Sequence, residues 1–365
     1  MALTWAQVLG WRLQRQLLDP VGTGSVADVV TRMGAMPAWP DAAAELGIAV
    51  RRHDGRSGDA AQALAAGTVV KVFAFRGALH LMTPQDAGAY LVVRASSRMW
   101  ELASWRRFYE LEADDWPAFR DYVRQALDDG PLTHTELVAA LRRSSRYRHV
   151  AGILADGNDT ILKPLTWQGV MGLGPARDGE ATFLLLDELP GWAGVPEPDE
   201  AGPTVIAAYL HTHGPASPDR IHDWVGKGLG AKRKDVARWL QDVEKHCEHV
   251  DVEGDDLLVL RDDLDALHAA TPSTAVRLLP SRDHWVMAPG SSDTRVVPAA
   301  HKDVVSRLAN LVVAGGVVLG TWTVRAERLE VTWFEESGPA PADALGRETD
   351  RLSQILDRTL EPVVA

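Results

Sequence analysis

The feature that most constrains the fold is a recurring order of helices followed by a strand pair. Residues 116–127 are predicted helix, and "DGPLTHTELVAALRR" adds a turn, a Thr133-x-x-Glu136 capping box and a second helix. A similar order starts at Thr204, with a hairpin turning at residues 253–255. Gly-Pro turns at 130–131 and 214–215 stand at equivalent places, about 84 residues apart. This order is typical of a winged helix. The sequence therefore predicts repeated winged helices rather than one large α/β sheet.

A first copy precedes these two. Helices are expected over residues 4–18, 26–33 with Ser25 as cap, 41–50 with Asp41 as cap, and 60–66. "TVVKVFAFRGALHLM" then reads as a hairpin split at Arg76-Gly77, and Thr83-Pro84 starts another helix. The rigid stretch Pro37-Ala38-Trp39-Pro40 separates two of the helices, because each proline fixes its own φ.

After Thr271 the sequence becomes rich in strand-forming residues, and an amphipathic helix is expected over residues 341–356. The expected class is α+β. We predict winged-helix units at 1–112, with a linking helix, at 113–200 and at 201–272, followed by a β-rich C-terminal domain at 273–365.

Composition narrows the class of protein further. The chain has 365 residues, 46% of them hydrophobic, so a packed core is expected. No apolar run is long enough to span a membrane, and the first residues do not read as a signal peptide. The single cysteine, Cys247, excludes an internal disulfide and a zinc site built on CxxC pairs. A cytoplasmic monomer without a membrane anchor is therefore expected.

Five phrases, in their order and spacing, resemble the bacterial winged-helix family that contains the AlkZ-like (YcaQ-type) DNA glycosylases: "WRLQRQ" at 11–16, "RGALHLMTPQD" at 76–86, "ILKPLTWQGVMGLGP" at 161–175, "RLLPSRDHWVMAPG" at 277–290 and "GGVVLGTW" at 315–322. The resemblance implies three tandem winged helices and a C-terminal β-barrel-like domain, forming a C-shape around a duplex-sized cleft. It also implies excision of alkylated or crosslinked purines from double-stranded DNA, with no cofactor.

The same resemblance locates a catalytic signature. The family's Gln-x-Gln or Gln-x-Asp pair, which orients the attacking water, falls on Pro37 and Trp39 when the segments are placed without a gap. Proline has no polar side chain and an indole N–H only donates, so neither can accept a proton from water. Asp41 is the replacement acceptor if a small gap is allowed. The alternative is that Asp41 caps the next helix and that Glu45 is solvated.

Other candidates carry competing interpretations. Trp39 is a packing anchor in a turn, a surface on which a base stacks, or a plug that fills the vacated pocket. His80 is either a structural histidine or a group facing the cleft. In a histidine group around 211–249, His246-x-x-His249 has a possible metal-ligand spacing, but it straddles a helix end and has no obvious third ligand, so no metal site is expected. Basic residues at related places in the units predict phosphate contacts, and the DNA-binding candidates are Arg12, Arg15, Arg51, Arg52, Arg76, His80, Arg142, Arg143, Lys232, Arg233 and Lys234.

Two functional hypotheses follow. The first is a protein that binds duplex DNA, alkylated or distorted, on a glycosylase scaffold whose catalytic pair is replaced. The second is a non-catalytic protein that uses the cleft for a small molecule or a protein partner, with Trp39 and Trp167 as apolar anchors. The net charge of -12 favours the second slightly, although a local basic patch suffices for DNA binding.

Overall fold

The computed structural model describes residues 3–290 and 293–364. In the first third of the chain, the helices and strands are α1 (Trp5–Arg15), α2 (Val26–Met33), β1 (Met36–Pro37), α3 (Asp41–Ala49), α4 (Asp59–Ala65), β2 (Val70–Phe73), β3 (Leu79–Met82) and α5 (Pro84–Ala95). Capping boxes at Thr4 and Ser25 start α1 and α2, and the predicted cap at Ser25 is confirmed. Thr83 caps α5, with a proline in its first turn.

The middle of the chain repeats this alternation. Its elements are α6 (Ala103–Tyr109), α7 (Trp116–Leu127), β4 (Leu132–Thr133), α8 (His134–Arg143), α9 (Arg148–Ala155), α10 (Lys163–Trp167), β5 (Met171–Arg177) and β6 (Glu180–Leu185). The predicted capping box at Thr133 is confirmed at the start of α8. The next segment contains α11 (Pro198–His213), α12 (Pro218–Ile221), the π-helix η6 (His222–Gly228), α13 (Arg233–Glu244), β7 (Cys247–Val252), β8 (Asp255–Leu260) and α14 (Leu264–Ala269).

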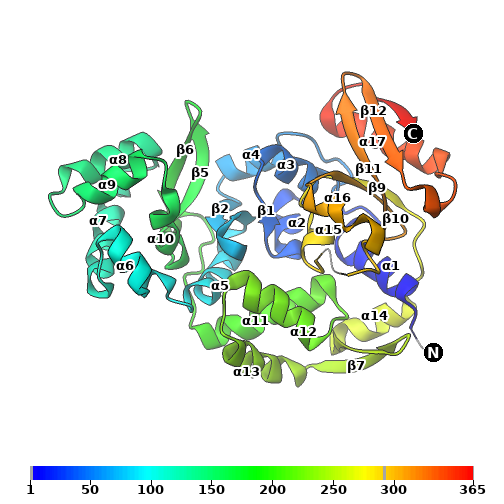
Figure 1. Ribbon diagram of the computed structural model, residues 1–365, viewed down its shortest axis with the longest axis horizontal. Helices are drawn as coiled ribbons and strands as arrows, with labels where there is room; N and C mark the ends of the chain where they lie inside the picture. Colours follow the sequence, from blue (N-terminus) through cyan, green and yellow to red (C-terminus); the bar gives the residue numbers. More distant parts are fainter. Residues whose placement is uncertain (1–2, 291–292, 365) are drawn as a thin grey trace.

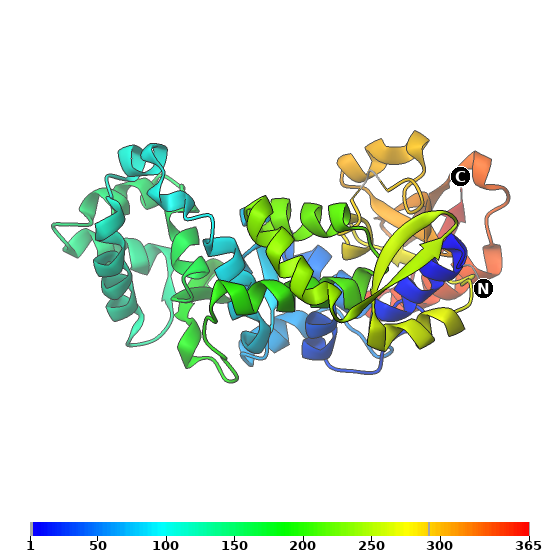
Figure 2. The ribbon, with the colours of Figure 1, turned by 90° about the horizontal axis from the view of Figure 1, so that it is seen from below.

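The C-terminal part contains β9 (Val276–Leu279), α15 (His284–Met287), α16 (Lys302–Ser306), β10 (Asn310–Ala314), β11 (Val317–Arg325), β12 (Arg328–Trp333), α17 (Ala342–Leu356) and β13 (Glu361–Val364). Its strands form one sheet in the order β13-β12-β11-β10-β9, in which the two outer strands do not pair with each other. The sheet is therefore open, and the expected barrel-like closure is wrong. Figures 1 and 2 show this sheet at one end of the molecule and α6 to α10 at the other.

The strand pairs of the first two segments do not stay separate. They join with β1 and β4 into a six-stranded sheet in the order β1-β3-β2-β5-β6-β4. The link between the two hairpins is the pairing of Lys71 in β2 with Leu173 in β5. Only the β7–β8 hairpin remains a two-stranded sheet of its own, among the residues that the structure describes. A mixed helix and sheet fold is thus confirmed.

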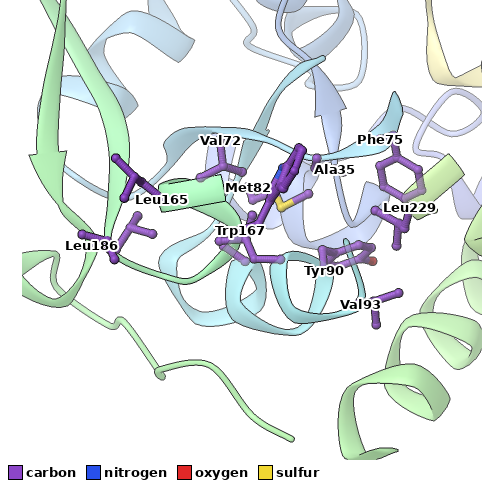
Figure 3. Close-up of a cluster of buried hydrophobic side chains, with 14 of the residues drawn as sticks. Ala35, Val72, Phe75, Met82, Tyr90, Val93, Leu165, Trp167, Leu186 and Leu229 are labelled. Carbon is purple, nitrogen blue, oxygen red and sulfur yellow. The ribbon is translucent and has the colours of Figure 1, made fainter. Parts of the chain in front are cut away.

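Two large apolar clusters hold these parts together. One extends from α5 through α7 to α13 and includes Tyr90, Trp167 and Trp239. Figure 3 shows part of it, with Trp167 beside Met82. The other joins the C-terminal sheet to Leu9 and Leu13 of α1 and to Leu46 of α3. The amino-terminal helices and the carboxy-terminal sheet therefore share a core, although they are far apart in sequence.

Candidate functional site

The short strand β1 brings Pro37 against a histidine. Pro37 pairs with His80 across β1 and β3, and the Ala38 N–H donates to the Leu79 carbonyl over 2.9 Å. The turn into β1 requires Gly34, whose φ is 74° and whose missing side chain leaves room for the Tyr90 hydroxyl. Because side chains alternate along a strand, this pairing fixes the orientation of the residues around position 37.

Trp39 follows β1 and leaves the core. Its side chain is 62% exposed, which makes it the most exposed of the large apolar residues in the described part of the chain. The packing-anchor interpretation of Trp39 is therefore wrong. The indole instead borders a cavity of about 380 Å³, a volume within the usual range for ligand sites.

This cavity is mostly apolar and is built by segments far apart in the sequence. Phe75 and Trp224 stack with ring centroids 4.2 Å apart, so η6 is pressed against the turn of the β2–β3 hairpin. Arg76 and Arg282 are its charged members, and neither makes an ion pair with the residues that the structure describes. The lining consists of Pro37, Trp39, Phe75, Arg76, Ala78, Leu79, His80, Trp224, Gly228, Arg282 and Met287.

His80 is the neutral polar side chain of this lining. It is buried, and its Nδ1 lies 3.0 Å from the Ala78 carbonyl oxygen. A carbonyl only accepts, so Nδ1 carries the proton and Nε2 is left as an acceptor. Burial lowers the pKa of His80 to about 4, which keeps the ring neutral near pH 7. The site thus contains an imidazole acceptor directly across from Pro37.

A family model described as DNA glycosylase AlkZ-like matches residues 30–355. The chain belongs to the AlkZ-like DNA glycosylase family. It is 35% identical over 369 residues to the interstrand DNA cross-link repair glycosylase of Streptomyces sahachiroi, covering 100% of this chain and 99% of that relative. The solved structure of the Streptomyces sahachiroi DNA glycosylase AlkZ matches with a TM-score of 0.94 at 33% identity, covering 100% of both chains. The family resemblance predicted from the five phrases is confirmed.

Asp41 stands apart from the cavity of this AlkZ-like chain. Its carboxylate is 70% exposed and accepts from Lys71 Nζ over 2.8 Å. It is the first residue of α3, where Pro40 occupies the N-cap position, so the expected capping role of Asp41 is wrong. Glu45 is not simply solvated either. It accepts from the backbone N–H groups of Gly58, Ala60 and Ala61 and so caps α4 from a neighbouring helix.

Two of the expected phosphate contacts are buried. Arg51 is fully buried, with both terminal nitrogens on Asp283, and Arg12 is buried and donates to the Pro215 carbonyl over 2.8 Å. The prediction that these two side chains bind phosphate is therefore wrong. Both hold segments together, since their partners lie more than 200 residues away.

The remaining basic candidates differ in whether their side chains are exposed and whether they already form ion pairs. Arg15 pairs with Asp263 at 3.5 Å, and Arg52 pairs with Asp54 at 3.1 Å and with Asp59. Arg142 and Arg143 are exposed in the last turn of α8. Lys232, Arg233 and Lys234 form an exposed basic run at the start of α13, with Lys232 at its N-cap position. These two exposed clusters and Arg76 keep the features that phosphate contacts need.

Sequence reasoning missed several cavity residues. Arg282 and Met287 lie inside the phrase "RLLPSRDHWVMAPG", so the family resemblance already pointed to their segment. Phe75 directly precedes another of those phrases. Trp224 carries no local signal, because only the π-helix η6 turns it toward Phe75.

The described residues contain no group of three or more His, Cys, Asp or Glu side chains arranged to hold a metal ion. No helix within 3–290 or 293–364 combines the length and apolar character needed to cross a membrane.

Proposed function

We propose that this chain binds double-stranded DNA carrying an alkylated or crosslinked base, and that the displaced base enters the cavity beside Trp39. The observation that carries the proposal is the exposed indole at the edge of an apolar cavity of about 380 Å³. Enzymes that act on a base in a duplex take it out of the stack and hold it between aromatic and apolar side chains. The activity named for the Streptomyces sahachiroi relative, interstrand cross-link repair, supports the same substrate class.

We also propose that the three helix-and-hairpin segments are tandem winged helices that follow a duplex along a C-shaped cleft. Their bounds would be 1–112, 113–200 and 201–272, with the C-terminal sheet domain at 273–365. The exposed basic clusters at the ends of α8 and α13 support phosphate contacts by the second and third units. Arg76 and Arg282 would contact the backbone beside the displaced base, since both are unpaired at the cavity.

Chemistry is the second part of the proposal. Pro37 and Trp39 hold the positions of the family's catalytic pair and provide no acceptor for a water proton. Asp41 lies outside the cavity lining and is engaged by Lys71. His80 lines the cavity with a neutral ring whose Nε2 accepts. Any base excision by this chain therefore runs through water held by His80 rather than by Asp41.

A salt titration of DNA binding tests the first part. Affinity for an alkylated duplex should fall steeply with added salt, because phosphate contacts release counterions. Trp39→Ala should weaken binding about tenfold, since stacking of one base contributes about 1–3 kcal/mol. Phe108→Ala is the matched control, because Phe108 is 57% exposed and lies outside the cavity. Absence of binding at low salt would favour the alternative, a small-molecule or protein partner in the cleft.

A base-release assay on the same duplex tests the second part. Release that is lost in His80→Ala and kept in Asp41→Ala supports the His80 route. Release that depends on Asp41 and survives His80→Ala contradicts it. Tight binding without release in the unmodified protein would identify a damage-binding protein whose catalytic pair has been lost, and it would leave the DNA-binding proposal standing.

A further inference from the structure

A second cavity shares no lining residue with the cavity beside Trp39. Its volume is about 580 Å³, and it is formed where α5, α7 and α10 meet α11 and α13. Four tryptophans line it: Trp100, Trp116, Trp167 and Trp239. The ring centroid of Trp100 lies 6.1 Å from that of Trp116 and 6.3 Å from that of Trp167. Such continuous aromatic walls favour a flat, unsaturated occupant over an aliphatic one.

The charged groups around this cavity are almost all committed. Arg98 donates to Glu101 over 2.7 Å, while Arg238 pairs with Asp199 and lies 3.6 Å from Asp235. Asp199 also accepts from Trp239 Nε1 over 3.0 Å. Arg120 of α7 is the exception, since it has no ion pair or hydrogen bond within the part of the chain that the structure describes.

Two neutral groups on the same walls are also unsatisfied. The Trp116 Nε1–H and the Gln168 side-chain amide nitrogen are buried and lack a hydrogen-bond partner among the described residues. Both are donors, and so is the guanidinium of Arg120. Natural proteins leave few buried donors unpaired, because each lost hydrogen bond to water then goes uncompensated. The polar groups of these lining residues that lack a partner are therefore all hydrogen-bond donors.

We propose that this cavity is a binding site for a small, planar aromatic anion, such as an aromatic carboxylate. The ring system lies against the tryptophans, and the anionic oxygens accept from Arg120. The volume of about 580 Å³ falls within the range of small-molecule sites. The site is separate from the cavity beside Trp39, with which it shares no lining residue.

The proposal is tested by calorimetric titration of the full chain with 2-naphthoate as the probe. Two comparison compounds separate its chemical requirements: 2-naphthylmethanol keeps the rings without the charge, and cyclohexanecarboxylate keeps the charge without the aromatic face. We expect one molecule of 2-naphthoate to bind per chain, and each comparison compound to bind about tenfold more weakly.

Variants on one helix locate the binding. Arg120→Gln should weaken 2-naphthoate binding about tenfold, because a charge-assisted contact is lost. Arg124→Gln is the matched control: it lies one turn further along α7, pairs with Asp187 and should change affinity less than about twofold. Trp116→Phe keeps most of the aromatic wall, so it should weaken binding less than Arg120→Gln does. Thermal melting of each variant checks its folding.

Three results would overturn the proposal. They are no binding of 2-naphthoate at millimolar concentration, equal binding of cyclohexanecarboxylate, and equal affinity in Arg120→Gln and Arg124→Gln. None of these results tests DNA binding. A failure of this inference can therefore be distinguished from a failure of the proposed function.

Discussion

Arg51 and Asp283 form a two-point ion pair in which both side chains are fully buried. Arg51 Nη1 also donates to the Gly47 carbonyl over 2.7 Å, and Asp283 accepts from the backbone N–H of Trp285. The pair joins the end of α3 to the segment that carries Arg282. It therefore holds one wall of the Trp39 cavity, the segment with Arg282, against the end of α3, without contacting the cavity itself.

Removing one partner of this pair should be costly. Arg51→Met leaves the Asp283 carboxylate buried and uncompensated, so we expect the free energy of unfolding to fall by about 3–5 kcal/mol. Urea denaturation followed by circular dichroism measures the change. Arg52→Met, at the neighbouring position with the mostly exposed Asp54 as one partner, should cost only about 1 kcal/mol. Equal losses in the two variants would show that the buried pair has no special role.

Acid should destabilise the protein through His80. Its pKa is lowered to about 4 in the folded chain against 6.5 for the free group. Between those values the unfolded chain binds a proton that the folded chain does not, so stability falls as the pH drops from about 6.5 to about 4. The effect amounts to roughly 3 kcal/mol at the acid end and vanishes above pH 6.5.

The variant His80→Gln isolates this effect. Its free energy of unfolding should fall less between pH 6.5 and pH 4 than that of the unmodified protein, whatever its absolute stability. Buried His284 remains in both proteins, and its pKa is lowered to about 3 mainly by desolvation, with His80 only a lesser cause, so its contribution changes little between them. Parallel stability curves for the two proteins would mean that His80 titrates normally.

Local structure was predictable from the sequence where capping residues mark it. The helices at 26–33 and 116–127 were placed at their observed bounds, because Ser25 and the proline after Trp116 fix where each begins. The merging of two hairpins was not predictable. It depends on Lys71 pairing with Leu173, a contact that no local pattern encodes.

Among the site residues, too, local sequence predicted some features, whereas others depend on distant contacts. Arg51 and Arg52 are adjacent and chemically alike, yet one is fully buried and the other is in part exposed. The difference arises from Asp283, which lies 232 residues further along the chain. Likewise, the family resemblance predicted a role for Pro37 and Trp39 from the sequence alone, but the exposure of Trp39 follows from the packing of β1 against β3.

Glu45 should stabilise the start of α4. Its carboxylate accepts from three backbone N–H groups at distances of 2.7–3.1 Å, and Gly58 at the N-cap position has no side chain to do so. Glu45→Ala should lower the free energy of unfolding by about 1–2 kcal/mol and speed amide exchange at Ala60 and Ala61. Asp41→Ala, which removes only an exposed contact to Lys71, should leave both measurements nearly unchanged. Unaltered exchange in Glu45→Ala would exclude this capping role.

The two exposed basic clusters should set the salt dependence of DNA binding. In a plot of log affinity against log salt concentration, each phosphate contact contributes about 0.9 to the slope. Replacing Lys232, Arg233 and Lys234 by alanine should therefore reduce the slope by up to about 3, and Arg142→Ala with Arg143→Ala by up to about 2. Arg51→Met should not change the slope, because its guanidinium is buried on Asp283. If neither cluster alters the slope, both are solvated surfaces, and the duplex must follow a different path across the protein.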